Sequence, residues 1–219
     1  MAENVIPADL LALLRQVDTP TVCNAIEVAQ GKRGFNRFTR GTMQHSKPGD
    51  PAMVGFARTA KISGLLPARE PADVIRARRM DYFKSMAAGQ GPRLAVIEDI
   101  DFPNCIAGWW GEIHVAVHKG LGQVGAITNG VMCDLDVMDA GFPVLAGSIG
   151  PSHGFFHVVE IGGACRPHGN AYITRRVDAC GQARGDSYPK RNHCGSQTSH
   201  RNSHRKRSDS SRSCARTWL

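Results

Sequence analysis

The chain changes character abruptly after Gly163, and this change limits what can fold. Residues 1–163 alternate between helical and strand periodicity and carry 15 Lys and Arg against 16 Asp and Glu, a net charge of −1. Residues 164–219 carry 12 Lys and Arg against 3 Asp, a net charge of +9, with almost no aliphatic residue after Val177. Such a segment buries too little apolar surface to offset its chain entropy. We therefore expect one domain over residues 1–163 and a basic, disordered tail over residues 164–219.

Within residues 1–163 the hydrophobic period switches repeatedly between that of a helix and that of a strand. Asp18, Thr19 and Pro20 form a helix start, because Asp or Thr accepts from the free amides and Pro suits the first turn. The pattern predicts helices at residues 7–16, 18–31, 71–87, 109–119 and 134–140, and strands at residues 53–62, 94–97, 124–128, 144–146 and 155–161. Helices alternating with strands predict a mixed α/β domain built from layers.

The sequence argues against a membrane-spanning protein and favours a reducing compartment. No apolar run approaches the roughly 18 residues that a membrane span needs. The first residues, MAENVIPADLLALLRQ, have acidic residues before a short apolar stretch and no basic region, so we predict no signal peptide. Cys23, Cys105 and Cys133 follow no disulfide pattern. We therefore expect a cytoplasmic protein.

The segment most able to carry chemistry spans residues 108–151. In it, Asp134 follows a glycine turn, and a carboxylate there would lie at a sheet edge, where mixed α/β folds bind ligands. Gly111 lies at a turn into a predicted helix, whose free amides could hold an anion. Together these residues could form a site for a small carboxylate beside a divalent cation. The alternative is that Asp134 is a helix cap and the glycines serve only turns.

Several ordered stretches match the pattern of one known family. Residues 54–60, VGFARTA, are similar to its first core strand. Residues 111–113, GEI, followed by residues 129–134, NGVMCD, match its central motif, a GE turn and then DG-x-x-RD. Residues 142–144, FPV, and residues 150–151, GP, fit its next strand and turn. On these motifs, residues 17–161 resemble the RraA-like family, which includes 4-hydroxy-4-methyl-2-oxoglutarate/oxaloacetate-type aldolases and regulators that bind ribonuclease E.

The resemblance implies a site made of six residues. Asp134 falls on the family's metal-binding and catalytic Asp. The loop whose backbone amides hold the 2-oxo acid falls on Gly111, Glu112, Ile113 and His114. Cys133 falls where the family has the substrate-binding Arg that clamps the substrate carboxylate. A neutral thiol cannot make the bidentate, charge-assisted contact of a guanidinium, so this departure predicts weakened aldolase activity.

For the whole protein, the resemblance implies a layered β/β/α swivelling-domain fold and a homotrimer or hexamer with sites between subunits. The implied enzyme is a divalent-metal-dependent lyase that uses Mg²⁺ or Mn²⁺ and takes a small 2-oxo acid as its substrate. Its reaction would be aldol cleavage of a 4-hydroxy-4-methyl-2-oxoglutarate type substrate to pyruvate, decarboxylation of oxaloacetate, or both. The alternative is a non-catalytic regulator that binds a protein partner such as ribonuclease E.

Two further groups of polar residues have alternative explanations. His114 and His118 are spaced i, i+4, which can bind zinc, but the sequence offers no third ligand, so we expect packed or surface histidines. Glu98, Asp99 and Asp101 end a predicted strand, where they either face a site or form a solvated acidic loop.

Three explanations compete for the basic tail. Its SHRKRSDSSRS run is typical of arms that displace phosphate counterions, although we do not predict nucleic-acid binding. The second explanation is a plain disordered tail, and the third is a reading-frame error. Codons can be chosen so that the frame shifted by one base reads approximately LPGELMHADRHGVIPIPNA, which fits the two strands that the family has next. We therefore predict a frameshift or sequencing error after about Gly163, which would leave the RraA-like domain incomplete at its C-terminal end.

Overall fold

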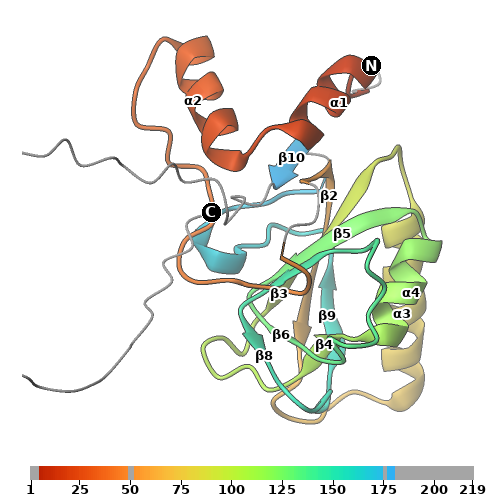
Figure 1. Ribbon diagram of the computed structural model, residues 1–219. Coiled ribbons are helices and arrows are strands. Elements are labelled where there is room, and N and C mark those ends of the chain that lie inside the picture. The colour runs from red at the N-terminus through yellow and green to blue at the C-terminus, as the bar shows by residue number, and fades with distance from the viewer. Residues whose placement is uncertain (1–4, 49–51, 175–176, 181–219) are drawn as a thin grey trace, which may run out of the picture.

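The computed structural model describes residues 5–48, 52–174 and 177–180 (Figure 1). The helices in these ranges are α1 (Ala8–Gln16), α2 (Thr19–Gln30), α3 (Ala72–Ala87) and α4 (Glu112–Gly120), with a short 3-10 helix η1 (Pro167–Gly169). The strands are β1 (Gln44–His45), β2 (Met53–Ser63), β3 (Arg93–Asp99), β4 (Gly108–Trp110), β5 (Gln123–Thr128), β6 (Val131–Met132), β7 (Val144–Ala146), β8 (Ser148–Ile149), β9 (His157–Ile161) and β10 (Val177–Cys180).

Two sheets organise the described chain. The larger one has seven strands in the order β1-β7-β5-β3-β2-β10, and β9 also pairs with β2. Its strands β2, β3, β5 and β7 are parallel, whereas β1, β9 and β10 are antiparallel to their neighbours. The smaller sheet is parallel, in the order β4-β6-β8. The helices α3 and α4 lie side by side against the larger sheet (Figure 1). The fold class is therefore mixed α+β, as the sequence predicts.

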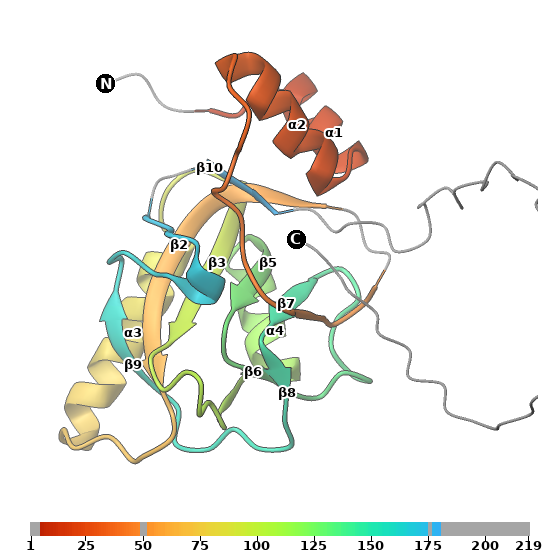
Figure 2. The same ribbon diagram turned by 90° about the vertical axis from the view of Figure 1, so that its left-hand side faces the viewer.

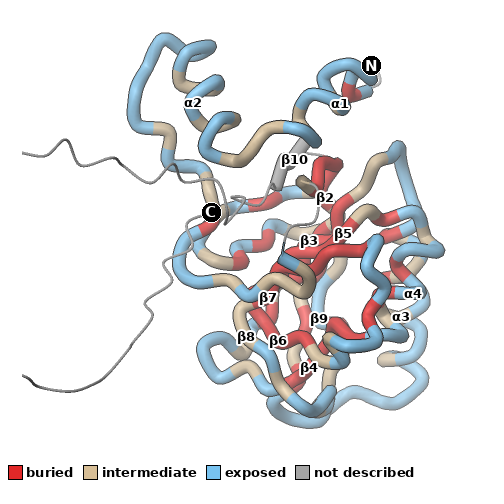
Figure 3. The backbone as a smooth tube through the Cα atoms, in the orientation of Figure 1, coloured by how far each residue is buried: buried red, intermediate tan, exposed pale blue. Residues whose placement is uncertain are grey.

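The main core lies between the two sheets and the helices α3 and α4. Its side chains include Ile62 of β2, Tyr82 of α3, Trp109 and Trp110 of β4, and Val115 of α4. All five are buried, and buried residues are concentrated in the sheets (Figure 3). Because β2 is a central strand covered on both faces, most of its residues are buried, including those at alternate positions.

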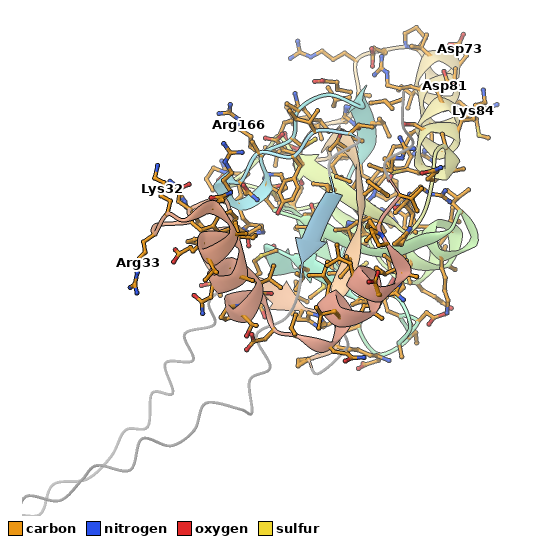
Figure 4. All side chains as sticks on the ribbon, turned by 90° about the horizontal axis from the view of Figure 1, so that it is seen from above. Lys32, Arg33, Asp73, Asp81, Lys84 and Arg166 are labelled. Atoms are coloured by element: carbon orange, nitrogen blue, oxygen red, sulfur yellow. The ribbon has the colours of Figure 1, made fainter. Side chains whose placement is uncertain are left out.

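Helix α3 has a buried side that faces the core and a charged side that is exposed. Tyr82 and Met86 are its buried residues. Asp73, Asp81 and Lys84 lie along its outer side (Figure 4), where Lys84 Nζ is 2.9 Å from Asp81 Oδ1. The helix predicted at residues 71–87 is therefore confirmed.

The helices α1 and α2 rise from one end of the larger sheet (Figure 2). The predicted helix start is confirmed, because the Asp18 side chain accepts from Thr21 N at 2.9 Å. Gly31 ends α2 in the left-handed conformation, with φ of 60°. Neither helix has a buried residue, and α1 contacts the body through Leu11 and Leu14. Of the helices within the described ranges, none is long and apolar enough to cross a membrane.

Two predicted helices differ in the structure. Trp109 and Trp110 belong to β4, so the helix predicted at residues 109–119 begins at Glu112. A short apolar run fits a buried strand as well as a buried helix, and here pairing with β6 decides it. Residues 134–140 form turns instead of a helix.

Residues that follow Gly163, the end of the predicted domain, still pack on the body of the described structure. Thr59 Oγ1 donates to Gly163 O at 2.7 Å and lies 2.6 Å from Thr174 Oγ1. Cys165 and Tyr172 are buried and pair through their backbones. These two residues bury apolar surface even though the segment is polar in its overall composition. Of the predicted tail, residues 164–219, the structure describes 164–174 and 177–180, and Val177–Cys180 pair with β2 as β10. The other tail residues lie outside the described ranges.

Candidate functional site

Asp134 lies in a turn that follows β6, and its backbone conformation is unusual. Its φ of 56° is in the left-handed region, which few residues other than Gly adopt, although Asp tolerates it. The amides of Val137 and Met138 both donate to Asp134 O at 3.0 Å. The turn leaves the Asp134 side chain exposed and beside the start of α4.

Gly111 allows this carboxylate to meet the N-terminus of α4. The first turn of the helix closes where Val115 N donates to Gly111 O at 3.0 Å. Glu112 N donates to Asp134 Oδ2 at 3.3 Å. A Cβ atom at position 111 would lie 2.8 Å from Cys133 Sγ and closer still to Asp134 Oδ2, so any other residue there would displace these two side chains. The positive end of the helix dipole stabilises a carboxylate at this place.

Cys133 lies beside Asp134 as a neutral thiol. Its amide donates to Trp110 O at 2.7 Å, which fixes the residue next to β4. Burial and the neighbouring Asp134 carboxylate raise the pKa of the Cys133 thiol to about 11. The thiol is therefore protonated near neutral pH, and it carries no charge with which to bind a carboxylate.

The first turn of α4 presents amides, while the His114 side chain turns away. Glu112 and Ile113 are exposed, with Ile113 at 75 %. Like all first-turn amides, those of Ile113 and His114 have no acceptor inside the helix. The His114 ring packs against the rings of Trp109 and Phe156, with centroids 4.4 and 5.1 Å away. Burial lowers the pKa of His114, so its imidazole is neutral near pH 7.

The pair of histidines on α4 is a packing feature. His118 is fully buried, with Nε2 2.6 Å from Tyr82 Oη and Nδ1 2.6 Å from His114 O. Both of its nitrogens are therefore used inside the core. Among the described residues, no group of three or more His, Cys, Asp or Glu side chains is placed to hold a metal ion.

The small number of ligand side chains around Asp134 restricts the kind of metal that the described site fits. Zinc sites need three or four protein ligands, which the described residues around Asp134 do not supply. Mg²⁺ keeps several waters and is often bound by one or two carboxylates plus substrate oxygens. Asp134, exposed beside the first-turn amides of α4, has the chemistry of one protein ligand to a Mg²⁺ or Mn²⁺ ion of that kind.

The acidic run at the end of β3 is divided in the structure. Glu98 and Asp99 line a cavity of about 580 Å³ at the carboxyl ends of β3 and β5. Asp99 is buried, and its backbone is held on both sides by the Asn129 amide, at 2.8 and 2.9 Å. Asp101 instead caps a loop, because its Oδ2 accepts from Gly64 N at 2.7 Å. This cavity joins segments distant in sequence, so no local motif could predict it.

Neither a protein-family model nor a curated protein matches this chain. Among solved structures, RraAS2 of Streptomyces coelicolor, described as an unusual member of the RNase ES inhibitor RraA protein family, is 18% identical, with a TM-score of 0.59 over 81% of this chain and 83% of its own. A structure described as novel cellulases from microbes associated with the gut ecosystem is 16% identical, with a TM-score of 0.65 over 84% and 81%. The RNA-processing inhibitor RraA from Thermus thermophilis is 10% identical, with a TM-score of 0.51 over 73% and 87%.

These likenesses show a shared fold, and they do not choose an activity. The matched structures are described in different functional terms, as inhibitors of RNA processing and as cellulases. A fold of this kind hosts more than one function, so the activity has to be derived from the site.

Proposed function

Starting from the RraA-like fold of this chain, we propose that the protein is a divalent-metal-dependent carbon–carbon lyase that acts on 2-oxo dicarboxylic acids. Its reaction is retro-aldol cleavage of a 4-hydroxy-4-methyl-2-oxoglutarate type substrate to pyruvate, decarboxylation of oxaloacetate, or both. The observation that carries the proposal is the 3.3 Å contact between Glu112 N and Asp134 Oδ2. That contact joins a metal-binding type of carboxylate to an anion-binding turn. The working unit in this proposal is a cytoplasmic homotrimer or hexamer.

Each part of the site has its own role in the proposed reaction. The first-turn amides of Ile113 and His114 bind the substrate carboxylate, as helix N-termini bind anions in general. Asp134 holds Mg²⁺ or Mn²⁺, which when bound supplies Lewis-acid stabilisation of negative charge on the 2-oxo oxygen. Both reactions leave an electron pair on the carbon beside the 2-oxo group, so one arrangement serves both.

Cys133 favours a second candidate, a regulator that binds a protein partner such as ribonuclease E and has no chemistry of its own. The family pattern has Arg at this position, and the thiol here stays protonated because its pKa is raised to about 11. Without the guanidinium, the substrate carboxylate loses its bidentate partner. A chain that had lost catalysis would tolerate this change.

The two candidates differ in metal-dependent turnover. Pyruvate release from oxaloacetate is measured with Mg²⁺, with Mn²⁺ and with EDTA, and the rate of the metal without protein is subtracted. The lyase predicts turnover that EDTA abolishes. Asp134→Asn should remove that turnover, whereas Asp136→Asn, which changes an exposed carboxylate in the same turn, should retain it.

Three results would count against the lyase. They are turnover that survives EDTA, equal loss in both Asp variants, and no turnover above the metal alone in a folded protein. The last result, together with retained binding of ribonuclease E, supports the regulator.

A further inference from the structure

A cavity of about 330 Å³ lies between α3, the residues that follow β2 and the start of β9. Arg79 and Ile75 of α3 line it, and so do His153, Phe155 and His157. The lining residues include no carboxylate. Outside the lining, the carboxylates of Glu70 and Asp101 interact electrostatically with His157.

Arg79 is the permanently charged side chain that lines this cavity. Its Cζ atom lies 5.5 Å from the centroid of the Phe156 ring, which is a cation–π geometry. The adjacent Arg78 is engaged elsewhere, by Glu70 Oε2 at 2.7 Å and by Val158 O at 3.1 Å. In the part of the chain that the structure describes, Arg79 has no carboxylate partner. Its guanidinium is therefore available to an anion.

The two histidines of the cavity add donors to this cation. His157 Nδ1 lies 3.0 Å from Phe155 O, and His153 Nδ1 lies 3.3 Å from Gly154 O. A carbonyl oxygen only accepts, so each Nδ1 carries a proton, and protonation of the ring adds a second N–H at Nε2. An anion in the cavity can therefore be met by Nε2 atoms as well as by the guanidinium.

The rest of the lining is apolar. Ile75, Pro67 and Ala68 line the cavity with Phe155, which is 56 % exposed. A bare inorganic anion would leave these side chains in water, whereas an organic anion would cover them and gain their burial.

We propose that this cavity binds a small organic carboxylate that carries an aromatic or branched apolar group. Arg79 binds the carboxylate together with the imidazoles of His153 and His157, and Ile75 and Phe155 contact the apolar group. The cavity shares no residue with the Asp134 site.

A hydrogen bond nevertheless connects the cavity to β4, the strand that precedes α4 and the Asp134 site. Gly108 N, at the start of β4, donates to Ser152 O at 2.8 Å, next to His153. The proposed ligand site therefore borders the proposed lyase site without depending on its metal.

Benzoate tests the proposal, with benzamide as its uncharged isostere and inorganic phosphate as the anion without an apolar group. Binding to the full chain is followed by NMR at about pH 6, without added metal, where histidine is readily protonated. We expect benzoate to shift the His153 and His157 signals saturably and to bind at least about tenfold more tightly than either control. Arg79→Gln should weaken benzoate about tenfold, because a charge-assisted hydrogen bond is lost. Arg76→Gln, an exposed change on the same helix outside the cavity, should leave the affinity within about twofold.

Equal affinity for benzoate and benzamide, or equal losses in the two Arg variants, would overturn the proposal. If Arg79→Gln disturbs the fold, His153→Gln replaces it, because His153 is exposed. Unchanged benzoate affinity in that variant would also overturn the proposal. The measurement needs neither metal nor turnover, so it can fail while the lyase proposal stands.

Discussion

We predict that low pH lowers the free energy of unfolding of this protein because the buried His118 is neutral in the folded state. His118 is fully buried between Tyr82 Oη and His114 O, each 2.6 Å from one of its ring nitrogens. Because a carbonyl oxygen only accepts, Nδ1 carries the proton and Nε2 accepts from the Tyr82 hydroxyl. The side chain is thus satisfied as a neutral imidazole, and burial lowers the pKa of His118 to about 4.

The size of the effect follows from the two pKa values. In the unfolded chain a histidine titrates near pH 6.5, so as the pH falls the unfolded state takes up the proton first. The stabilisation is therefore complete above about pH 6.5 and is lost as the pH falls toward 4. A difference of about 2.5 pKa units corresponds to about 3 kcal/mol, of which about 2 kcal/mol is lost by pH 4.5. His114, whose pKa is lowered by burial, acts in the same direction, and Asp99, whose pKa is raised by burial, acts in the opposite one.

Urea unfolding of the wild type and of His118→Gln at pH 7 and pH 4.5 measures this contribution. The variant cannot titrate at position 118, but every other ionisable group is kept. We expect the free energy of unfolding of the wild type to fall by about 2 kcal/mol more than that of the variant between the two pH values. Parallel losses in the two proteins would refute the assignment to His118.

Two substitutions test the geometry around Asp134. Gly111→Ala should displace the Asp134 carboxylate and so weaken Mg²⁺ or Mn²⁺ binding in calorimetry, because its Cβ would lie within 3 Å of Asp134 Oδ2; Gly120→Ala, whose Cβ meets nothing within 4 Å, is the matched control, and equal effects would contradict the contact. Cys133→Arg should raise the catalytic efficiency of oxaloacetate decarboxylation by about one to two orders of magnitude, since one charge-assisted hydrogen bond is worth about 1.5–3 kcal/mol. Unchanged efficiency would mean that position 133 does not contact the substrate.

The elements that sequence predicts correctly are those with strong local signals. The cap at Asp18 and the stop at Gly31 define α2, and the alternation over residues 53–62 predicts the strand that becomes β2. The short strands β4, β6 and β8 exist only because they pair with one another, and a stretch of two or three residues carries no period of its own. For this reason the sequence predicts a helix for Trp109 and Trp110, which belong to β4 in the structure.

The candidate site likewise has parts that the sequence predicts and parts that depend on tertiary packing. Gly111 and Asp134 are combined into one candidate site by their two turns and again by the family motif, although Glu112 and Asp134, which share a hydrogen bond, are 22 positions apart in the sequence. The His114 ring packs against Phe156. Phe156 is distant from His114 in the sequence, so no local pattern predicts this contact. The cavity around Arg79 and His153 is likewise a product of tertiary packing.

The contacts made just after Gly163 bear on the predicted change of reading frame. Gly163 and Cys165 use backbone atoms to bond Thr59 and Tyr172, and Arg166 N donates to Glu98 at 3.0 Å. Backbone contacts of this kind do not depend on side chains, so a chain in the shifted frame could form them as well. We predict that the shifted frame keeps this hairpin and adds two paired strands after it, which would bury further apolar surface and raise the thermal midpoint. If a frame-corrected chain unfolds at the same temperature as this chain, the prediction of added strands is wrong. If independent sequencing reads show an intact frame across codon 163, the prediction of a frameshift is wrong.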